Sequence, residues 1–248
     1  MATNTTPRNS RPSPASSFKF ALQKYVDHPE TAPKDVVIFY DENYTVIRDL
    51  FPKAIIHWLI LPRKNSSKLP QKAFTSTAFY DATLTMVEKM RLRAEKELCS
   101  ILAKPNCKQD VTSNNENDQN CGTNSSSQNL IERMNLPPPL YIKAGCHAVP
   151  SMSNLHIHII SSDMNGPNLK NKKHYNSFNT RFFIPFDELN QLKPDDSRHN
   201  NQIMHALIKD SDMLCSWCQR NFTNKFTALR AHLQEEYHTY VKEKAKKL

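Results

Sequence analysis

The chain has 248 residues, a formal net charge of +9 and a pI near 9.2, and 38% of its residues are hydrophobic. This content supports one sizeable core with a small appended module, and the positive charge favours an anionic partner, because Lys and Arg release counterions when they neutralise phosphates. No run of about 18 apolar residues and no apolar N-terminal signal occurs, so we expect a soluble, intracellular protein with no membrane contact.

The first half of the chain predicts a tail, a short helix, three strands and a long helix, in that order. Residues 1–16 are rich in Ser, Thr, Pro and Asn, and we expect a disordered tail. Apolar residues at helical spacing from Phe18 to Val26 predict a short helix that stops at His28-Pro29. Three β-rich runs, at 36–41, 44–49 and 55–62, predict an antiparallel meander, and the spacing over 73–102 predicts one long helix covering it.

The second half begins with a polar segment, residues 104–128, which we interpret as a low-complexity surface insertion whose Cys107 and Cys121 are free thiols. Two further alternating runs, at 140–145 and 154–161, predict two more strands. The order of elements indicates an α+β fold with a five-stranded antiparallel sheet. We expect a catalytic domain over 17–192 and a small C-terminal module over 193–248.

Two histidines lie one residue apart in the last of these runs. Alternation on a strand places His156 and His158 on one face, with the intervening apolar residues on the other, and His147 and Ser151 lie shortly upstream. Buried histidines that only pack are the simplest alternative. Imidazole can also attack phosphorus and form a phosphoramidate while a second histidine protonates the departing oxygen. A metal site is the third reading, although no carboxylate or cysteine stands at a matching spacing nearby.

The sequence "HIHII" resembles the core of the histidine triad motif, with Asn154 where the motif has its first histidine. "GCHAVPSMSNLHIHIISSDM", "YDENYTVIRDLFPKAIIHWLILPR" and "KKHYNSFNTRFFIP" resemble segments of the aprataxins, whose fungal members share this asparagine, and the likeness covers about residues 18–248 except the insertion. The resemblance implies a histidine triad-type fold. It also implies a nuclear DNA repair hydrolase that removes AMP from adenylated 5′ ends of nicked or double-stranded DNA.

The resemblance also implies roles for single residues. His156 matches the nucleophile that becomes transiently linked to AMP, and His147 matches the histidine that protonates the leaving DNA 5′-phosphate. His158 and Ser151 match groups that hold the nonbridging phosphate oxygens. Because Asn154 replaces a histidine, we expect a backbone carbonyl to orient the nucleophile. The superfamily also uses an acidic residue to bind the ribose hydroxyls, and Asp49 matches it; alternatively, Asp49 is only a turn residue after a strand. His57 either lines the nucleotide pocket or packs in the core, and we expect packing.

A basic stretch follows the histidine strand and is placed to hold the DNA backbone, although such a run is often only a solvated face. Its candidate DNA contacts are Lys170, Lys172, Lys173 and His174. Phe18 matches a wedge aromatic that would stack on the terminal base pair, with a hydrophobic staple as the alternative.

The C-terminal module has the spacing of a zinc finger. Cys215 and Cys218 form C-x2-C, and His232 follows after thirteen residues, so we expect one structural Zn²⁺. Glu236 lies four residues on, on the same helical face, and matches fungal aprataxins; we favour it as the fourth ligand over His238. Lys225 and Arg230 are expected to contact DNA.

The sequence therefore predicts a monomeric enzyme that hydrolyses the anhydride between AMP and DNA through a covalent histidine–AMP intermediate. Two alternatives remain at this point. One is a histidine triad hydrolase of small nucleotides, which would need neither the finger nor the basic stretch. The other is a zinc-dependent DNA-end binding protein without activity.

Overall fold

The computed structural model describes residues 19–64, 69–103 and 140–245 of the chain. The tail 1–16, the wedge candidate Phe18 and the insertion 104–128 lie outside the described residues, and so do Cys107 and Cys121. Among the described helices, none combines the length and the apolar character that crossing a membrane requires.

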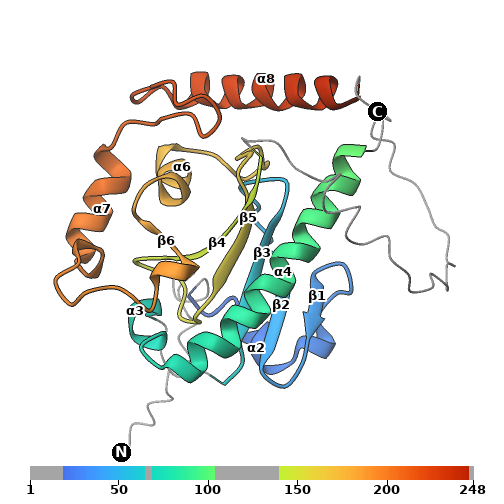
Figure 1. Ribbon diagram of the computed structural model, residues 1–248, viewed down its shortest axis with the longest axis vertical. Coiled ribbons are helices and arrows are strands. Elements are labelled where there is room, and N and C mark those ends of the chain that lie inside the picture. The colour runs from blue at the N-terminus through green and yellow to red at the C-terminus, as the bar shows by residue number, and fades with distance from the viewer. Residues whose placement is uncertain (1–18, 65–68, 104–139, 246–248) are drawn as a thin grey trace, which may run out of the picture.

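A single antiparallel sheet forms the centre of the fold, with strand order β1-β2-β3-β5-β4-β6 (Figure 1). This confirms the predicted α+β class, but the sheet has six strands in the described part of the chain where five were expected. The strands are β1 (Val37–Tyr40), β2 (Tyr44–Arg48), β3 (His57–Pro62), β4 (Ile142–His147), β5 (Ile157–Ser161) and β6 (Phe183–Pro185).

The additional strand, β6, pairs with the end of β4 through Cys146 opposite Ile184. Its approach requires Gly145, because a Cβ there would lie 2.2 Å from the carbonyl oxygen of Ile184. A three-residue strand that ends on Pro185 is too short to display alternation, so the sequence pattern does not reveal it.

The helices fall on both faces of the sheet. The helix predicted over 73–102 is one helix that begins at Thr77; a separate short helix that starts at Pro70 precedes it, and the chain turns between them at Phe74, which is buried in the core. The helices are α2 (Gln23–Asp27), α3 (Pro70–Ala73), α4 (Thr77–Ala103), α6 (Lys172–Asn179), α7 (Asn201–Asp210) and α8 (Phe226–Ala245), with 3₁₀ helices η1 (Pro29–Thr31), η2 (Phe186–Glu188) and η3 (Ser197–His199).

Helix α4 covers one face of the sheet, as expected (Figure 1). Val87, Met90 and Leu98 are buried there against strand residues that include Ile157 and Ile159. The opposite face carries α2 and α6. The C-terminal module packs against both sides: Tyr240 belongs to the cluster under α4, and Cys215 and Leu229 belong to the cluster that contains Ile160 and Tyr175. The C-terminal module is therefore packed onto the sheet.

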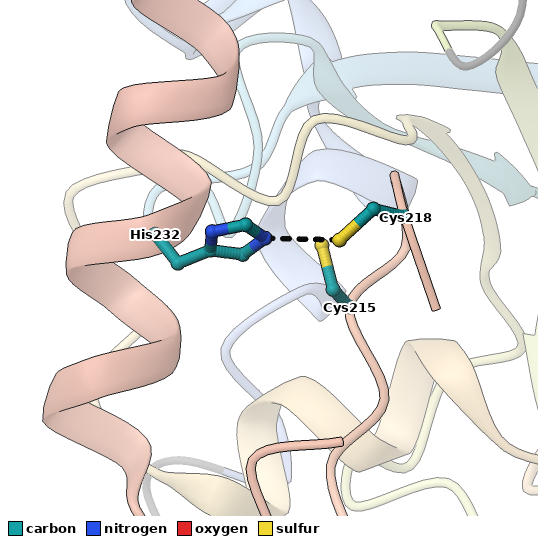
Figure 2. A group of neighbouring side chains, drawn as sticks. All are labelled: Cys215, Cys218 and His232. Atoms are coloured by element: carbon teal, nitrogen blue, oxygen red, sulfur yellow. Dashed lines mark hydrogen bonds between the residues drawn. The ribbon is translucent and has the colours of Figure 1, made fainter. Parts of the chain in front are cut away.

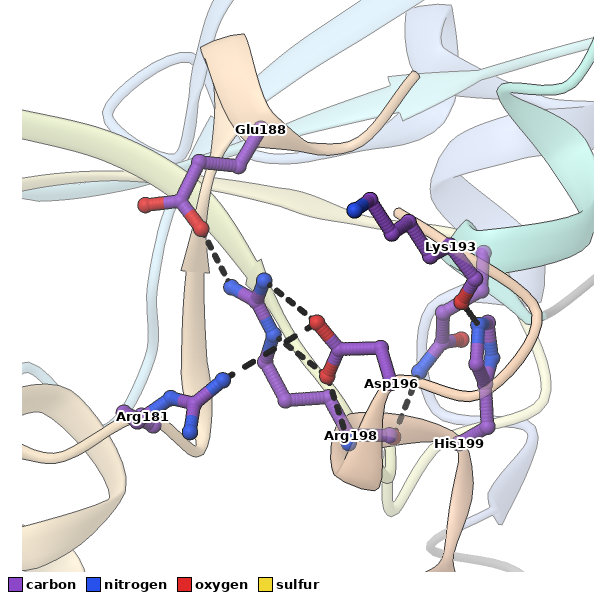
Figure 3. Close-up of polar contacts among 7 residues, drawn as sticks. Arg181, Glu188, Lys193, Asp196, Arg198 and His199 are labelled. Carbon is purple, nitrogen blue, oxygen red and sulfur yellow. Dashed lines mark hydrogen bonds and ion pairs between the residues drawn. The ribbon is translucent and has the colours of Figure 1, made fainter. Parts of the chain in front are cut away.

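The connection between β6 and α7 is fixed by a buried arginine (Figure 3). Arg198 is 8% exposed; it donates to both carboxylate oxygens of Asp196, at 3.0 and 2.8 Å, and to Glu188. The Arg198 guanidinium holds the pKa of the Asp196 carboxyl well below its usual range. Gln71 donates to the carbonyl oxygens of Arg198 and Ala148, so this connection is tied to the end of β4 that carries His147.

Candidate active site and zinc centre

Four histidines meet on the sheet face opposite α4, around a cavity of about 540 Å³. This volume suits a nucleotide. Strand β4 ends on His147, His156 directly precedes β5, and His158 is the second residue of β5, on the face that the alternation predicted. The ring of His158 lies 5.0 Å from that of His156 and 4.5 Å from that of His147, between centroids. His57, on β3, completes the group.

The expected backbone carbonyl orients His156. Its Nδ1 lies 2.8 Å from the carbonyl oxygen of Asn154, and only a protonated ring nitrogen can bond a carbonyl. The neutral ring therefore keeps the lone pair on Nε2, which is the form that can attack phosphorus. The Asn154 side chain donates to Gln23 Oε1 at 2.9 Å, so the residue that replaces the motif's histidine anchors α2 beside the cavity.

His57 is not a simple packing residue, which corrects our expectation. Its Nδ1 accepts the backbone N–H of Lys53 at 3.2 Å, which leaves the proton on Nε2. Nε2 lies 3.0 Å from His158 Nδ1 and donates to it. His158 must then carry its own proton on Nε2, a buried atom that has no hydrogen-bond partner among the described residues and can donate to a phosphate oxygen. The tautomer of His158 is thus set from β3.

Asp49, His57 and His158 place ligand atoms within 4.8 Å of one another, a grouping that could hold a metal ion. The spacing argument against a carboxylate near the histidines was therefore wrong, because the fold brings Asp49 in from another strand. The hydrogen bonds nevertheless place protons at His57 Nε2 and consume the lone pair of His158 Nδ1. A metal ion would need the lone pairs of these nitrogens free. The arrangement therefore favours a chain of hydrogen bonds from Lys53 N–H through His57 to His158, which we call the relay.

Burial lowers the pKa of all four histidines. The pKa of His57 falls to about 4, and those of His147 and His158 lie well below the usual 6.5, because desolvation disfavours the imidazolium and the other histidines and Lys53 add repulsion. Desolvation also lowers the pKa of His156. The four rings are neutral at pH 7, so lysine side chains supply the positive charge of the cavity.

Asp49 and Ser151 both line the cavity. Asp49 Oδ1 accepts the backbone N–H of Phe51 at 2.7 Å, which is the turn role considered as its alternative. Its Oδ2 lies 3.5 Å from His57 Nε2 and remains able to accept from a ligand hydroxyl. The exposed Ser151 stands at the opening, in the turn between β4 and β5.

The basic stretch divides into two groups. Lys170, Lys173 and His174 line the cavity. Lys172 instead reaches the zinc-binding segment, where its Nζ donates to Asn224 Oδ1 and, at 3.4 Å, to the carbonyl oxygen of Asp210. Lys172 points away from the cavity because successive helical residues point about 100° apart, and its contact with DNA stays a prediction.

The predicted zinc ligands Cys215, Cys218 and His232 point toward one another (Figure 2). The ligand atoms of Cys215, Cys218 and His232 lie within 4.8 Å of one another, and Cys218 Sγ is 3.1 Å from His232 Nε2. Tetrahedral zinc holds sulfur and nitrogen ligands roughly 3.5 Å apart, so these residues fit the ion. Burial raises the pKa of the Cys215 thiol to about 11, so zinc binding must release its proton.

Glu236, the favoured fourth ligand, has its Oε1 3.3 Å from His232 Nε2, but it lies outside the group of three residues whose ligand atoms are all within 4.8 Å of one another. His238 is exposed and its ring contacts Tyr237. Lys225 is exposed near the start of α8. Arg230 Nη1 donates to the carbonyl oxygens of Gly166 and Leu169, at 3.1 and 2.6 Å, which holds α8 on the loop after β5, a role that sequence reasoning missed.

Two family models match the chain: the HIT domain over residues 30–165 and the C2HE / C2H2 / C2HC zinc-binding finger over residues 179–239. Fold and site together define a histidine triad protein with a C-terminal zinc finger, and zinc binding follows from that class and the three converging ligands. The aprataxin-like protein of Saccharomyces cerevisiae is 35% identical over 90% of this chain and 98% of its own length, and that of Schizosaccharomyces pombe is 31% identical over 89% and 82%. The chain belongs to the aprataxin family.

Solved structures agree with this assignment. Hnt3 in complex with DNA and guanosine matches with a TM-score of 0.59 and 30% identity, over 92% of this chain and 99% of that one. The aprataxin ortholog Hnt3 in complex with DNA matches with a TM-score of 0.58 and 29% identity, over 92% and 98%. The chicken aprataxin (Gallus gallus) is 28% identical over 82% of this chain and 51% of its own length.

Proposed function

We propose that this protein is a DNA repair hydrolase that removes AMP from 5′-adenylated DNA ends left by abortive ligation. One observation carries the proposal: His156 lines a nucleotide-sized cavity with its Nδ1 bound to the Asn154 carbonyl, which frees Nε2 for attack on phosphorus. Membership of the aprataxin family and the likeness to Hnt3 bound to DNA support DNA as the substrate.

The reaction has two steps. His156 Nε2 attacks the adenylate phosphorus and forms an N–P bond as the P–O bond to the DNA 5′-phosphate breaks. His147 gives its proton to the departing oxygen, because the phosphates of bound substrate favour the imidazolium that burial disfavours in the free protein. Water then loses a proton to His147 and hydrolyses the phosphoramidate, which releases AMP.

Other groups hold the adenylate and the DNA. The Nε2–H of His158 and the hydroxyl of Ser151 donate to the nonbridging phosphate oxygens, where negative charge grows. Asp49 Oδ2 accepts from the ribose hydroxyls, and this favours a ribonucleotide. Lys170 and Lys173, at the cavity, neutralise the DNA backbone.

The zinc finger has a structural role in this proposal. We infer one Zn²⁺ per chain, held by Cys215, Cys218, His232 and Glu236. The ion would fix the start of α8 against the turn that carries the two cysteines. Metal analysis of the purified protein tests the stoichiometry. We also propose that the protein is a monomer and acts in the nucleus, where its substrate is; sedimentation and imaging of the tagged chain test these two points.

The experiment that tests the function is a gel assay on a nicked duplex with a 5′-adenylate, with wild type, His156→Ala and diadenosine polyphosphate as a small substrate. The proposal predicts that wild type alone frees AMP from DNA, much faster than it cleaves the small substrate. Cleavage of the small substrate alone would assign a small-nucleotide hydrolase instead. Binding of DNA without cleavage of either substrate would assign a non-catalytic end-binding protein.

A further inference from the structure

Helix α6 presents one face to the nucleotide cavity and another to the zinc-binding segment. Lys173, His174 and Phe178 line the cavity. Tyr175 and Asn176 are 0% and 1% exposed and belong to the other face. Helical geometry separates these faces, since His174 and Phe178 are four residues apart and share a side, whereas Tyr175 points about 100° away from His174.

The Tyr175 hydroxyl forms hydrogen bonds with the backbone on both sides of Cys215, one of the predicted zinc ligands. We call the turn that carries Cys215 and Cys218 the zinc knuckle. It donates to the carbonyl oxygen of Leu214 at 2.7 Å and accepts the backbone N–H of Ser216 at 2.8 Å. Residue Cys215 lies between these two peptide groups and is fully buried in the same apolar cluster as Tyr175. The position of this ligand is thus fixed by a side chain of α6.

The same helix contacts the histidines. The Phe178 ring centroid lies 4.6 Å from that of His147, 5.1 Å from that of His158 and 5.3 Å from that of His57. A tilt of α6 would move this ring against the histidines and would displace the cations of its cavity face. Close packing transmits such a shift, because cores contain little free space.

We propose that Tyr175 is a positioning residue that couples the zinc site to the nucleotide cavity, so that zinc binding and nucleotide binding strengthen each other. Zinc holds the knuckle in the geometry that Tyr175 bonds, and Tyr175 holds α6 against the histidines. Linkage makes the effect reciprocal: the factor by which zinc raises AMP affinity equals the factor by which AMP raises zinc affinity. The inference takes from the proposed function only that a nucleotide occupies the cavity.

The test measures this factor in the full-length protein and in Tyr175→Phe, which keeps the ring and removes the hydroxyl. Zinc affinity is measured by competition with a chromophoric chelator, with and without saturating AMP. In wild type, AMP should raise zinc affinity by about fivefold or more. In Tyr175→Phe the factor should fall towards one, and zinc affinity without AMP should fall by about tenfold, because two backbone groups lose their partner.

The matched control is Tyr40→Phe, since Tyr40 is 50% exposed and lies on β1, the edge strand at the opposite end of the sheet from β6. It should keep the wild-type factor. Absence of any effect of AMP on zinc affinity in wild type would overturn the proposal, and so would an unchanged factor in Tyr175→Phe.

Hydrogen exchange on wild type gives a second test that does not depend on the stability of a variant. Removal of zinc should increase exchange at the amides of Lys172–Asn179 and leave those of the central turns of α4 unchanged. Equal protection of α6 with and without zinc would refute the coupling. Neither measurement uses hydrolysis, so a failure to cleave adenylated DNA would bear on the proposed function alone.

Discussion

Replacement of His57 by Phe tests the relay that sets the tautomer of His158. Phenylalanine retains the ring and removes both nitrogens, so Lys53 N–H and His158 Nδ1 each lose a bond, of 3.2 and 3.0 Å respectively. Both groups lie in a region where the rings are buried. His158 is then free to move its proton to Nδ1, which would leave a lone pair facing the phosphate.

The expected magnitude follows from these two bonds. A buried polar group left without its partner costs about 1–3 kcal/mol. If the cost of the bond lost at His158 raises the free energy of the transition state by this amount, hydrolysis slows by about 5- to 150-fold. Loss of the Lys53 bond acts on the fold, and we expect the free energy of unfolding to drop by about 1–3 kcal/mol.

The assay is the single-turnover rate on a 5′-adenylated nick, with thermal unfolding measured alongside. His28→Phe is the control, because the His28 side chain is 71% exposed and pairs only with Glu30 among the contacts described. It should keep the wild-type rate. A rate for folded His57→Phe within twofold of wild type would refute the relay and restore the packing interpretation.

Three further predictions concern zinc, DNA and pH. Glu236→Gln should weaken zinc binding by at least about tenfold in chelator competition while His238→Gln leaves it unchanged; the reverse result would make His238 the ligand. Lys173→Gln should reduce the slope of log K for DNA binding against log salt by about 0.9, and an unchanged slope would remove Lys173 from the DNA interface. The pKa of each clustered histidine is lower in the folded than in the unfolded state, so unfolding takes up protons below pH 6.5. Thermal stability should therefore decline as the pH falls from 6.5 towards about 4, the pKa of His57 in the folded protein. A flat profile would contradict the burial of these histidines as neutral rings.

Sequence patterns predicted those features that depend on short spacing. Alternation around His156 and His158 gave their shared face, and helical spacing gave the burial of Val87 and Met90 on α4. The separation of Cys215, Cys218 and His232 gave the metal cluster for the same reason. Each of these signals lies within one element or one small motif, where local geometry decides the outcome.

Features that depend on strand pairing could not be predicted in the same way. His57 and His158 are 101 residues apart, and they meet because β3 pairs with β5 with Leu59 opposite His158. This register makes the two histidines diagonal neighbours on one face. The sequence contained a partial signal, since His57 starts an otherwise apolar strand, but the identity of the neighbouring strand was needed to use it.

The roles of basic residues were the least predictable. Lys172 and Lys173 are adjacent, yet one bonds Asn224 and the other lines the cavity. Arg230 lies on the face of α8 that docks on the loop after β5, where it bonds two carbonyl oxygens. Charge alone does not distinguish a DNA contact from an interior one, because long cationic side chains also satisfy buried backbone groups.

The measurement that tests the account most directly is a rapid quench of wild type reacting with DNA whose 5′-adenylate carries a labelled phosphate. The account predicts an alkali-stable, acid-labile label on the peptide that contains His156, formed and lost on the time scale of AMP release. His156→Ala should neither take up the label nor release AMP. Release of AMP by His156→Ala at the wild-type rate, or turnover of wild type without labelled protein at any time point, would contradict nucleophilic attack by this histidine.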